Sequence, residues 1–170
     1  MPSLLEYMQF ATKVYAASSK NQIDAPAGWT LVNWVPDRFT GFSAGYFKNG
    51  NDVVISYTGT NSAVADPLNW TAGMGIPAPQ IFEALAYYFE VRAANPTANI
   101  TFTGHSLGGG LASLMAVFLD KQAMVFDEAP FQPAALSATV LTALAANIAA
   151  NGYNDPALND FMKSKGPGSN

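Results

Sequence analysis

The residues whose types could do chemistry together lie in one short stretch, residues 99–110. Residues 100–103 have the β-branched and aromatic composition of a buried strand, and an apolar helical pattern follows from Leu107 to Leu119. Between them, residues 104–108 read Gly-His-Ser-Leu-Gly. A sharp turn from strand to helix exposes a serine hydroxyl, and the flanking glycines let neighbouring backbones approach it. The order predicts that Ser106 is a nucleophile toward carbonyl carbon; the alternative is a glycine-rich turn with a structural serine.

A second polar segment, Ser-Tyr-Thr-Gly-Thr-Asn at residues 56–61, directly follows the apolar run Val53–Ile55. Acyl transfer at a serine needs N–H donors for the oxyanion that develops on the substrate. One such donor is the backbone N–H that follows the nucleophile, here that of Leu107. Thr60 lies where a loop after an earlier strand could supply the other. We therefore predict Thr60 and Leu107 as oxyanion donors; the alternative is a polar turn that closes the strand.

The general base and its acid are harder to find, because the chain contains one histidine, His105. Its side chain leaves the turn in a different direction from that of Ser106, so we predict that His105 packs and hydrogen-bonds beneath the turn. Asp127 follows an apolar segment and is one candidate acid; Asp155 is another, and an acid from outside this chain is the third alternative. Glu128 is predicted to be solvated or to lie at the rim of the site.

Composition limits the other functions. The 170 residues carry a formal net charge of −4, and the eight Lys and Arg residues are scattered, which argues against nucleic-acid binding. The absence of cysteine excludes disulfides and thiolate catalysis, and no metal-ligand spacing is present, so we expect neither a cofactor nor a metal. Only 12% of the residues are charged, which indicates a mostly buried chain, an apolar binding surface or a missing covering partner.

The elements that must position Ser106 alternate between helix and strand, which predicts an α/β fold with a mixed sheet. We expect a single domain over residues 1–170, with a flexible tail at 163–170 and a loop at 67–79. The expected helices are residues 3–18, 80–94, 107–119 and 134–151, and the expected strands are residues 28–36, 39–48, 52–57, 99–103 and 123–126.

Residues 50–131 resemble the class 3 lipase family of the α/β-hydrolases. The resemblance lies in Val-Ile-Ser-Tyr-Thr-Gly-Thr at 54–60, Asp-Pro-Leu-Asn-Trp at 66–70 and Thr-Gly-His-Ser-Leu-Gly-Gly-Gly-Leu-Ala at 103–112. Two positions depart from the family pattern: Thr58 stands where arginine is usual, and Asn69 where aspartate is common.

The resemblance implies an α/β-hydrolase-like mixed sheet flanked by helices, apparently incomplete at the carboxyl end. It implies Ser106 as the nucleophile and Thr60 and Leu107 as oxyanion donors, with no metal in the chemistry. The loop that this family often uses as a lid would contain Trp70, Met74 and Ile76, which become candidates for contact with an acyl chain.

The family also places its acid and histidine after the nucleophile, the histidine far beyond it. We therefore expect the amino-terminal, nucleophile-bearing portion of a longer carboxylic ester hydrolase, a lipase, esterase or phospholipase. Its partners would be a lipid or hydrophobic acyl ester and the missing carboxyl-terminal part, which would supply the histidine. The alternative is a non-catalytic lipid-binding or interaction module that retains the hydrolase frame. No cleavable signal peptide is visible at the amino terminus, and secretion through a signal beyond the carboxyl end stays open.

Overall fold

A five-stranded mixed sheet forms the centre of the molecule. The structure, a computed structural model, describes residues 1–16, 25–36, 40–59 and 79–169. The strands lie in the order β1-β2-β3-β4-β5; β1, β2 and β3 run antiparallel, and β3, β4 and β5 run parallel. The predicted mixed sheet is therefore confirmed. The strand bounds are β1 Thr30–Val35, β2 Ala44–Asn49, β3 Asp52–Tyr57, β4 Asn99–His105 and β5 Ala123–Phe126.

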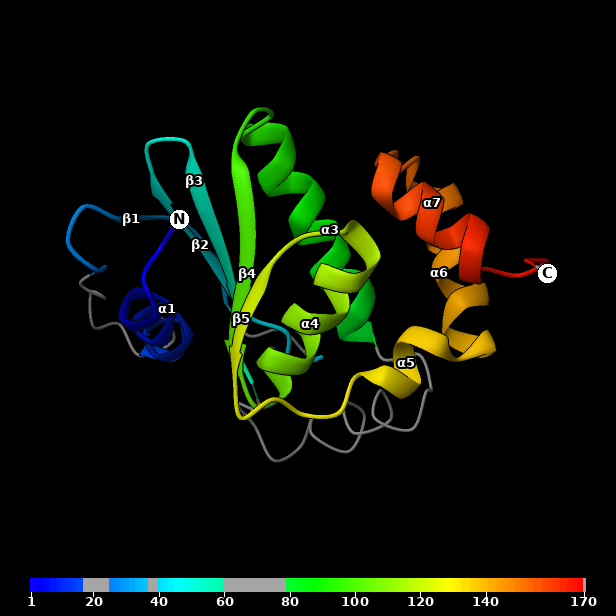
Figure 1. The fold of residues 1–170 in the computed structure, drawn as a ribbon, viewed down its shortest axis with the longest axis horizontal. Helices are drawn as coiled ribbons and strands as arrows, with labels where there is room; N and C mark the ends of the chain where they lie inside the picture. The colour runs from blue at the N-terminus through cyan, green and yellow to red at the C-terminus, as the bar shows by residue number, and fades with distance from the viewer. Residues whose placement is uncertain (17–24, 37–39, 60–78, 170) are drawn as a thin grey trace.

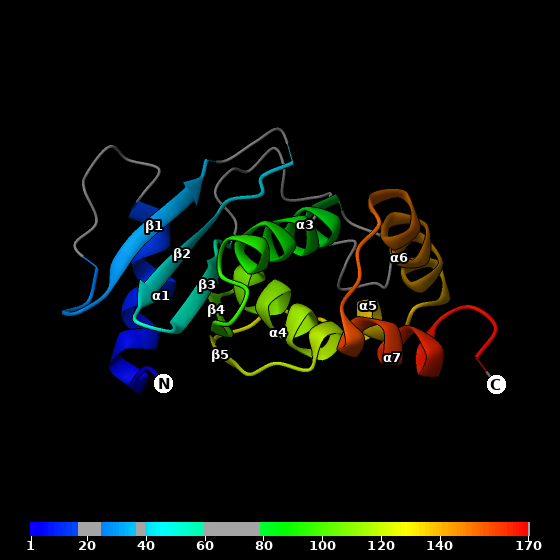
Figure 2. The ribbon, with the colours of Figure 1, turned by 90° about the horizontal axis from the view of Figure 1, so that it is seen from above.

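Helices cover both faces of this sheet. α1 lies on one face, α3 and α4 lie on the other, and α5, α6 and α7 form an outer layer beyond α3 and α4 (Figures 1 and 2). Within the described residues, no helix is long and apolar enough to cross a membrane. The helix bounds are α1 Leu4–Ala16, α3 Pro79–Ala94, α4 Leu107–Leu119, α5 Gln132–Leu136, α6 Ala138–Asn151 and α7 Pro156–Lys165.

The buried strands pack their side chains into two cores. The larger lies between the sheet and α3 and α4, where the Phe102 ring contacts the rings of Tyr57 and Tyr88. The smaller lies under α1, where Phe10 packs on Trp29 and Phe47. Because helices cover β3 on both faces, its apolar run could be recognised without any alternation of polar residues.

Three predicted elements differ from the structure. The strand expected over residues 39–48 begins only at Ala44, as β2. The helix expected over 134–151 is divided into α5 and α6, because Ser137 adopts an extended conformation and its hydroxyl accepts a hydrogen bond from the Val140 N–H. The prediction of a tail from residue 163 is wrong at its start, since α7 continues to Lys165. A tight hairpin joins β2 to β3, with Gly50 at φ 56° in its turn.

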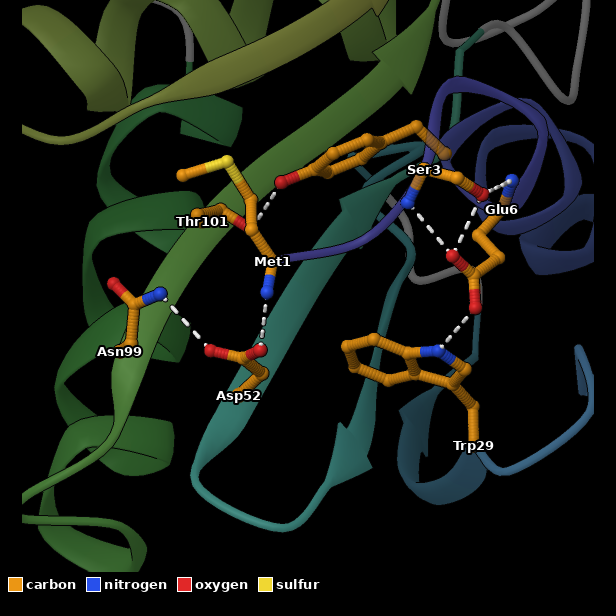
Figure 3. A network of polar contacts seen from close by, with 8 residues as sticks. Met1, Ser3, Glu6, Trp29, Asp52, Asn99 and Thr101 are labelled. Carbon is orange, nitrogen blue, oxygen red and sulfur yellow. Dashed lines mark hydrogen bonds and ion pairs between the residues drawn. The ribbon is translucent and has the colours of Figure 1, made fainter.

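A network of polar contacts attaches α1 to the amino ends of β3 and β4 (Figure 3). The Met1 ammonium donates to Asp52 over 2.7 Å, and the Asn99 amide donates to the same carboxylate over 3.0 Å. Glu6 accepts from the backbone and hydroxyl of Ser3, which caps the helix, and from the Trp29 indole N–H over 2.8 Å. The network lies at the opposite ends of these strands from Ser106.

These contacts predict a loss of stability in acid. The Met1 ammonium and Asn99 lower the pKa of Asp52 below its ordinary 3.8, and the backbone and hydroxyl of Ser3, followed by Trp29, lower the pKa of Glu6 below its ordinary 4.5. Because both pKa values are lower in the folded state, the contribution to stability is present above the ordinary values and is lost as pH falls through the folded ones. We expect Asp52→Asn to be less stable than the wild type at about pH 6 and to approach it near about pH 3 in urea unfolding. A difference that stayed constant with pH would contradict this.

Candidate active site

Ser106 occupies a strained turn between β4 and α4. Its backbone has φ 54° and ψ −125°, a conformation that residues with a Cβ rarely adopt. Such strain costs about 1–3 kcal/mol and persists only where the surrounding structure fixes it. The predicted sharp turn from strand to helix is thus present, with Ser106 at its apex and Leu107 as the first residue of α4.

Close backbone contacts explain the two glycines on either side of this serine. A Cβ added to Gly104 would overlap the carbonyl of Gly108, and a Cβ added to Gly108 would overlap the backbone of Tyr57 and Thr58. The Tyr57 backbone is also paired with Gly104 in the β3–β4 register. The end of β3 therefore lies directly against the nucleophile turn.

This contact brings the start of the predicted oxyanion loop to the turn. Both the N–H and the hydroxyl of Thr58 donate to the Ser43 carbonyl over 3.0 Å, which fixes the point at which the chain leaves β3. Thr60 lies outside the described residues, as do the predicted acyl-contact residues Trp70, Met74 and Ile76. The other predicted donor, the Leu107 N–H, stands at the amino end of α4, where backbone N–H groups have no partner within the helix.

The segment after β5 holds the backbone of Ser106. The Ser106 N–H donates to the Phe126 carbonyl over 3.1 Å, and the Ser106 carbonyl accepts from the N–H groups of Ala129 at 2.9 Å and Gly110 at 3.1 Å. Two of these three bonds come from residues 126–129. The conformation of Ser106 is therefore fixed by a segment that lies about 20 residues further along the chain.

His105 and Asp127 form an exposed pair beside the turn. The His105 Nε2 and an Asp127 carboxylate oxygen are 4.0 Å apart, and their side chains are 50% and 92% exposed. His105 lines a cavity of about 380 Å³ with Met8, Ala11, Thr12 and Phe126, which puts it on the α1 face of the sheet. The prediction that His105 is packed beneath the turn is therefore wrong in one respect, because half of its side chain is exposed. Asp127 ends β5 with φ 45°.

The second candidate acid, Asp155, is engaged elsewhere. One carboxylate oxygen accepts from the Tyr88 hydroxyl over 2.9 Å, and the other accepts from the N–H groups of Ala157 and Leu158 as the N-cap of α7. The Tyr88 ring packs on Phe102, which precedes Ser106 by four residues in β4, about 13 Å along a strand. The structure therefore places the Asp155 carboxylate between α3 and α7, with partners on both helices.

Asp155→Ala is expected to lower the free energy of unfolding by about 1–2 kcal/mol, since it removes a helix cap and a buried hydroxyl's acceptor. Asp155→Asn, which can still cap α7, should retain most of that stability. Urea unfolding of both variants measures the effect. Loss of Ser106 reactivity in Asp155→Asn, with stability unchanged, would instead restore Asp155 as a catalytic acid.

Glu128 is exposed, as predicted for a solvated or rim carboxylate, but the sequence did not reveal its contacts with α4. The Ser113 hydroxyl of α4 donates to the Glu128 carboxylate, and the Glu128 Cβ lies 3.0 Å from where a Cβ on Gly109 would stand. The signal available was the run of three glycines at 108–110. Glycine is unfavourable inside a helix, so such a run indicates that another segment lies close to that turn of the helix.

Metal chemistry finds no support in the described part of the chain. Among those residues, no group of three or more His, Cys, Asp or Glu side chains could hold a metal ion.

Burial raises the pKa of the Tyr57 phenol strongly, which keeps that group neutral as a hydrogen-bond donor to the Ala84 carbonyl. Among the described residues, the backbone N–H groups at the start of α4 and the pair formed by His105 and Asp127 lie beside Ser106.

Comparisons with known proteins identify the family and the fold of the chain. The family model of the Tle-like phospholipase domain matches residues 6–156. The extracellular phospholipase A1 of Serratia liquefaciens is 33% identical over 97 residues, which are 55% of this chain and 29% of that protein. The crystal structure of a lipase from Rhizopus microsporus var. chinensis matches with a TM-score of 0.50 at 18% identity, over 72% of this chain and 55% of the lipase. This likeness shows the α/β-hydrolase-like fold. The chain thus spans less than a third of the curated relative and about half of the fungal lipase.

Proposed function

Because this chain belongs to the family of Tle-like phospholipase domains, a class 3 lipase-like family, we propose that it bears the nucleophile of a lipid ester hydrolase. The observation that carries the proposal is the backbone of Ser106, strained at φ 54° and held between β4 and α4. A structural serine gains nothing from that conformation, whereas a nucleophile gains exposure of its hydroxyl.

In the proposed reaction, the Ser106 Oγ attacks the acyl carbonyl carbon and its proton passes to a general base. The N–H groups of Leu107 and Thr60 donate to the oxyanion of the tetrahedral intermediate. Collapse of this intermediate breaks the ester C–O bond and leaves the acyl group on Ser106, while the base returns the proton to the departing alcohol. Water activated by the same base then hydrolyses the acyl-enzyme.

The general base comes, in this proposal, from a carboxyl-terminal part of the enzyme outside these 170 residues. The one histidine of the chain, His105, lies on the α1 face of the sheet beside Asp127. This position supports the proposal that His105 is not the base that deprotonates Ser106. The acid is either Asp127, at the carboxyl end of β5, or a residue of that same carboxyl-terminal part.

The substrate class is proposed from the relatives. The name of the Serratia protein supports acyl esters of phospholipids as substrates, with Trp70, Met74 and Ile76 as contacts for the acyl chain. Because that relative is named as extracellular, we also infer export of this protein. Fractionation of the producing cells tests the export: recovery of the protein only from the cytoplasmic fraction would contradict it.

A fluorophosphonate probe tests the proposed nucleophile. The purified chain is incubated with the probe, and the adduct is located by intact mass and peptide mapping. Covalent labelling at Ser106 supports the proposal, and its rate should rise when the carboxyl-terminal part of the enzyme is present to supply the base. Labelling at another residue, or none with that part present, would contradict it.

The second candidate function is a non-catalytic lipid-binding module, which the single, misplaced histidine favours for the chain by itself. The two functions differ in their response to phospholipid vesicles. A binding module would sediment with vesicles and release no fatty acid, even with the carboxyl-terminal part present, whereas the hydrolase would release it.

A further inference from the structure

We propose that Glu128, through its hydrogen bond with Ser113, is a positioning residue that sets the backbone of Ser106. The inference rests on the proposed function, since positioning matters only where Ser106 is a nucleophile. Glu128 belongs to the segment between β5 and α5, and Ser113 belongs to α4. The pair therefore joins two segments that enclose the turn.

The first step is that residues 126–129 already hold Ser106 on both sides. The Ser106 N–H donates to the Phe126 carbonyl, and the Ser106 carbonyl accepts from the Ala129 N–H at 2.9 Å. Glu128 is the neighbour of Ala129, so any displacement of Glu128 moves the donor that binds the Ser106 carbonyl.

The second step is that this segment lies on α4 with little room to move. The Cα and Cβ of Glu128 lie 3.2 Å and 3.0 Å from where a Cβ on Gly109 would stand, and the Ala129 carbonyl oxygen lies 2.8 Å from the same point on Gly110. A Cβ at position 110 would overlap the backbone of the segment, and a Cβ at position 109 would require the segment to shift by a few tenths of an ångström.

The third step is that one side-chain hydrogen bond fastens the segment in this place. Ser113 is 8% exposed, and its hydroxyl donates to the Glu128 carboxylate. An ionised acceptor strengthens such a bond, although Glu128 is exposed and solvent screens part of this gain. Asp127, which precedes Glu128, has φ 45°, a backbone conformation that is unfavourable for a residue with a Cβ.

The test compares Ser113→Ala, Glu128→Ala and Glu128→Gln, with Glu90→Ala on the exposed surface of α3 as the matched control. Fluorophosphonate labelling of Ser106 is expected to slow by about ten- to a hundredfold in the two alanine variants, because small displacements of a reacting group cost rates of this order. Glu128→Gln, whose amide oxygen can still accept from Ser113, should restore most of the rate. A variant that combines Ser113→Ala and Glu128→Ala should be labelled no more slowly than the slower of the two single variants, because each substitution alone already removes the same hydrogen bond.

A second readout does not depend on reactivity. Hydrogen exchange of the Ala129 amide should accelerate at least about tenfold in Ser113→Ala and Glu128→Ala and remain unchanged in Glu90→Ala. The proposal would be overturned if exchange of the Ala129 amide were unchanged in folded Ser113→Ala. It would also be overturned if the wild type reacted with the probe and the alanine variants reacted at the same rate. If the wild type does not react while exchange accelerates as expected, the tether stands and the proposed function fails.

Discussion

Ser106→Ala is expected to abolish covalent labelling by a fluorophosphonate probe. In the presence of the general base, it should also lower lipid ester hydrolysis by at least about a thousandfold, because loss of a serine nucleophile leaves only binding and oxyanion stabilisation. Ser164→Ala, at an exposed position of α7, is the matched control and should react as the wild type does. Undiminished labelling of Ser106→Ala would show that the probe reacts elsewhere and would remove the basis for a nucleophile at this turn.

The same position should also reveal its strain in stability measurements. Alanine retains the Cβ that makes φ 54° unfavourable, whereas glycine adopts positive φ freely. We therefore expect Ser106→Gly to exceed Ser106→Ala by about 1 kcal/mol in free energy of unfolding, after allowance for the greater entropy that glycine loses on folding. Urea unfolding of the two variants, both unreactive, measures the difference. Greater stability of the alanine variant would mean that Ser106 is not strained.

These two results together separate function from architecture at one residue. If the serine serves packing alone, replacing it with alanine should not change reactivity toward the probe, and replacing it with glycine should not raise the free energy of unfolding. A serine kept as a nucleophile at a cost in stability should lose its reactivity in both variants and gain stability in one. The expected pattern belongs to the second case.

The sequence predicted those parts of the site that have a recognisable pattern in neighbouring residues. The turn at Ser106 was predictable because an apolar strand, two glycines and an apolar helix occur in immediate succession, and each of them has a local signature. The Glu128–Ser113 bond was not, because it joins side chains 15 residues apart through a segment with no regular periodicity. The place of Asp155 was likewise undetermined, since it depends on how α7 packs beside Tyr88.

The same distinction holds for the fold. β3 and α4 were predicted with their observed bounds because their apolar runs are bordered by clear turns. The division at Ser137 was missed because a serine in an alanine-rich run can be either an interior residue or a cap, and only its backbone conformation decides which. α7 was missed although Asp155 and Pro156 form a recognisable start signal, since its composition is largely polar.

Gly108→Ala is expected to destabilise the protein by at least about 4 kcal/mol or to prevent folding. The added Cβ would overlap the backbone of Tyr57 and Thr58 at the end of β3, and a backbone cannot move aside as a flexible side chain can. Gly45→Ala in β2 is the matched control. There the nearest atom is a Leu31 methyl at 3.3 Å, a side chain that can yield, so the change should stay within about 1 kcal/mol.

Thermal and urea unfolding of Gly108→Ala and Gly45→Ala measure this difference in stability. The result also bears on the proposed oxyanion donors. The contact between Gly108 and the end of β3 places Tyr57 and Thr58, which shortly precede Thr60 in the sequence, against the turn at Ser106. If Gly108→Ala were as stable as Gly45→Ala, the end of β3 would not lie against the turn. Thr60 would then have no structural argument as an oxyanion donor, and the second donor would have to be sought on another loop.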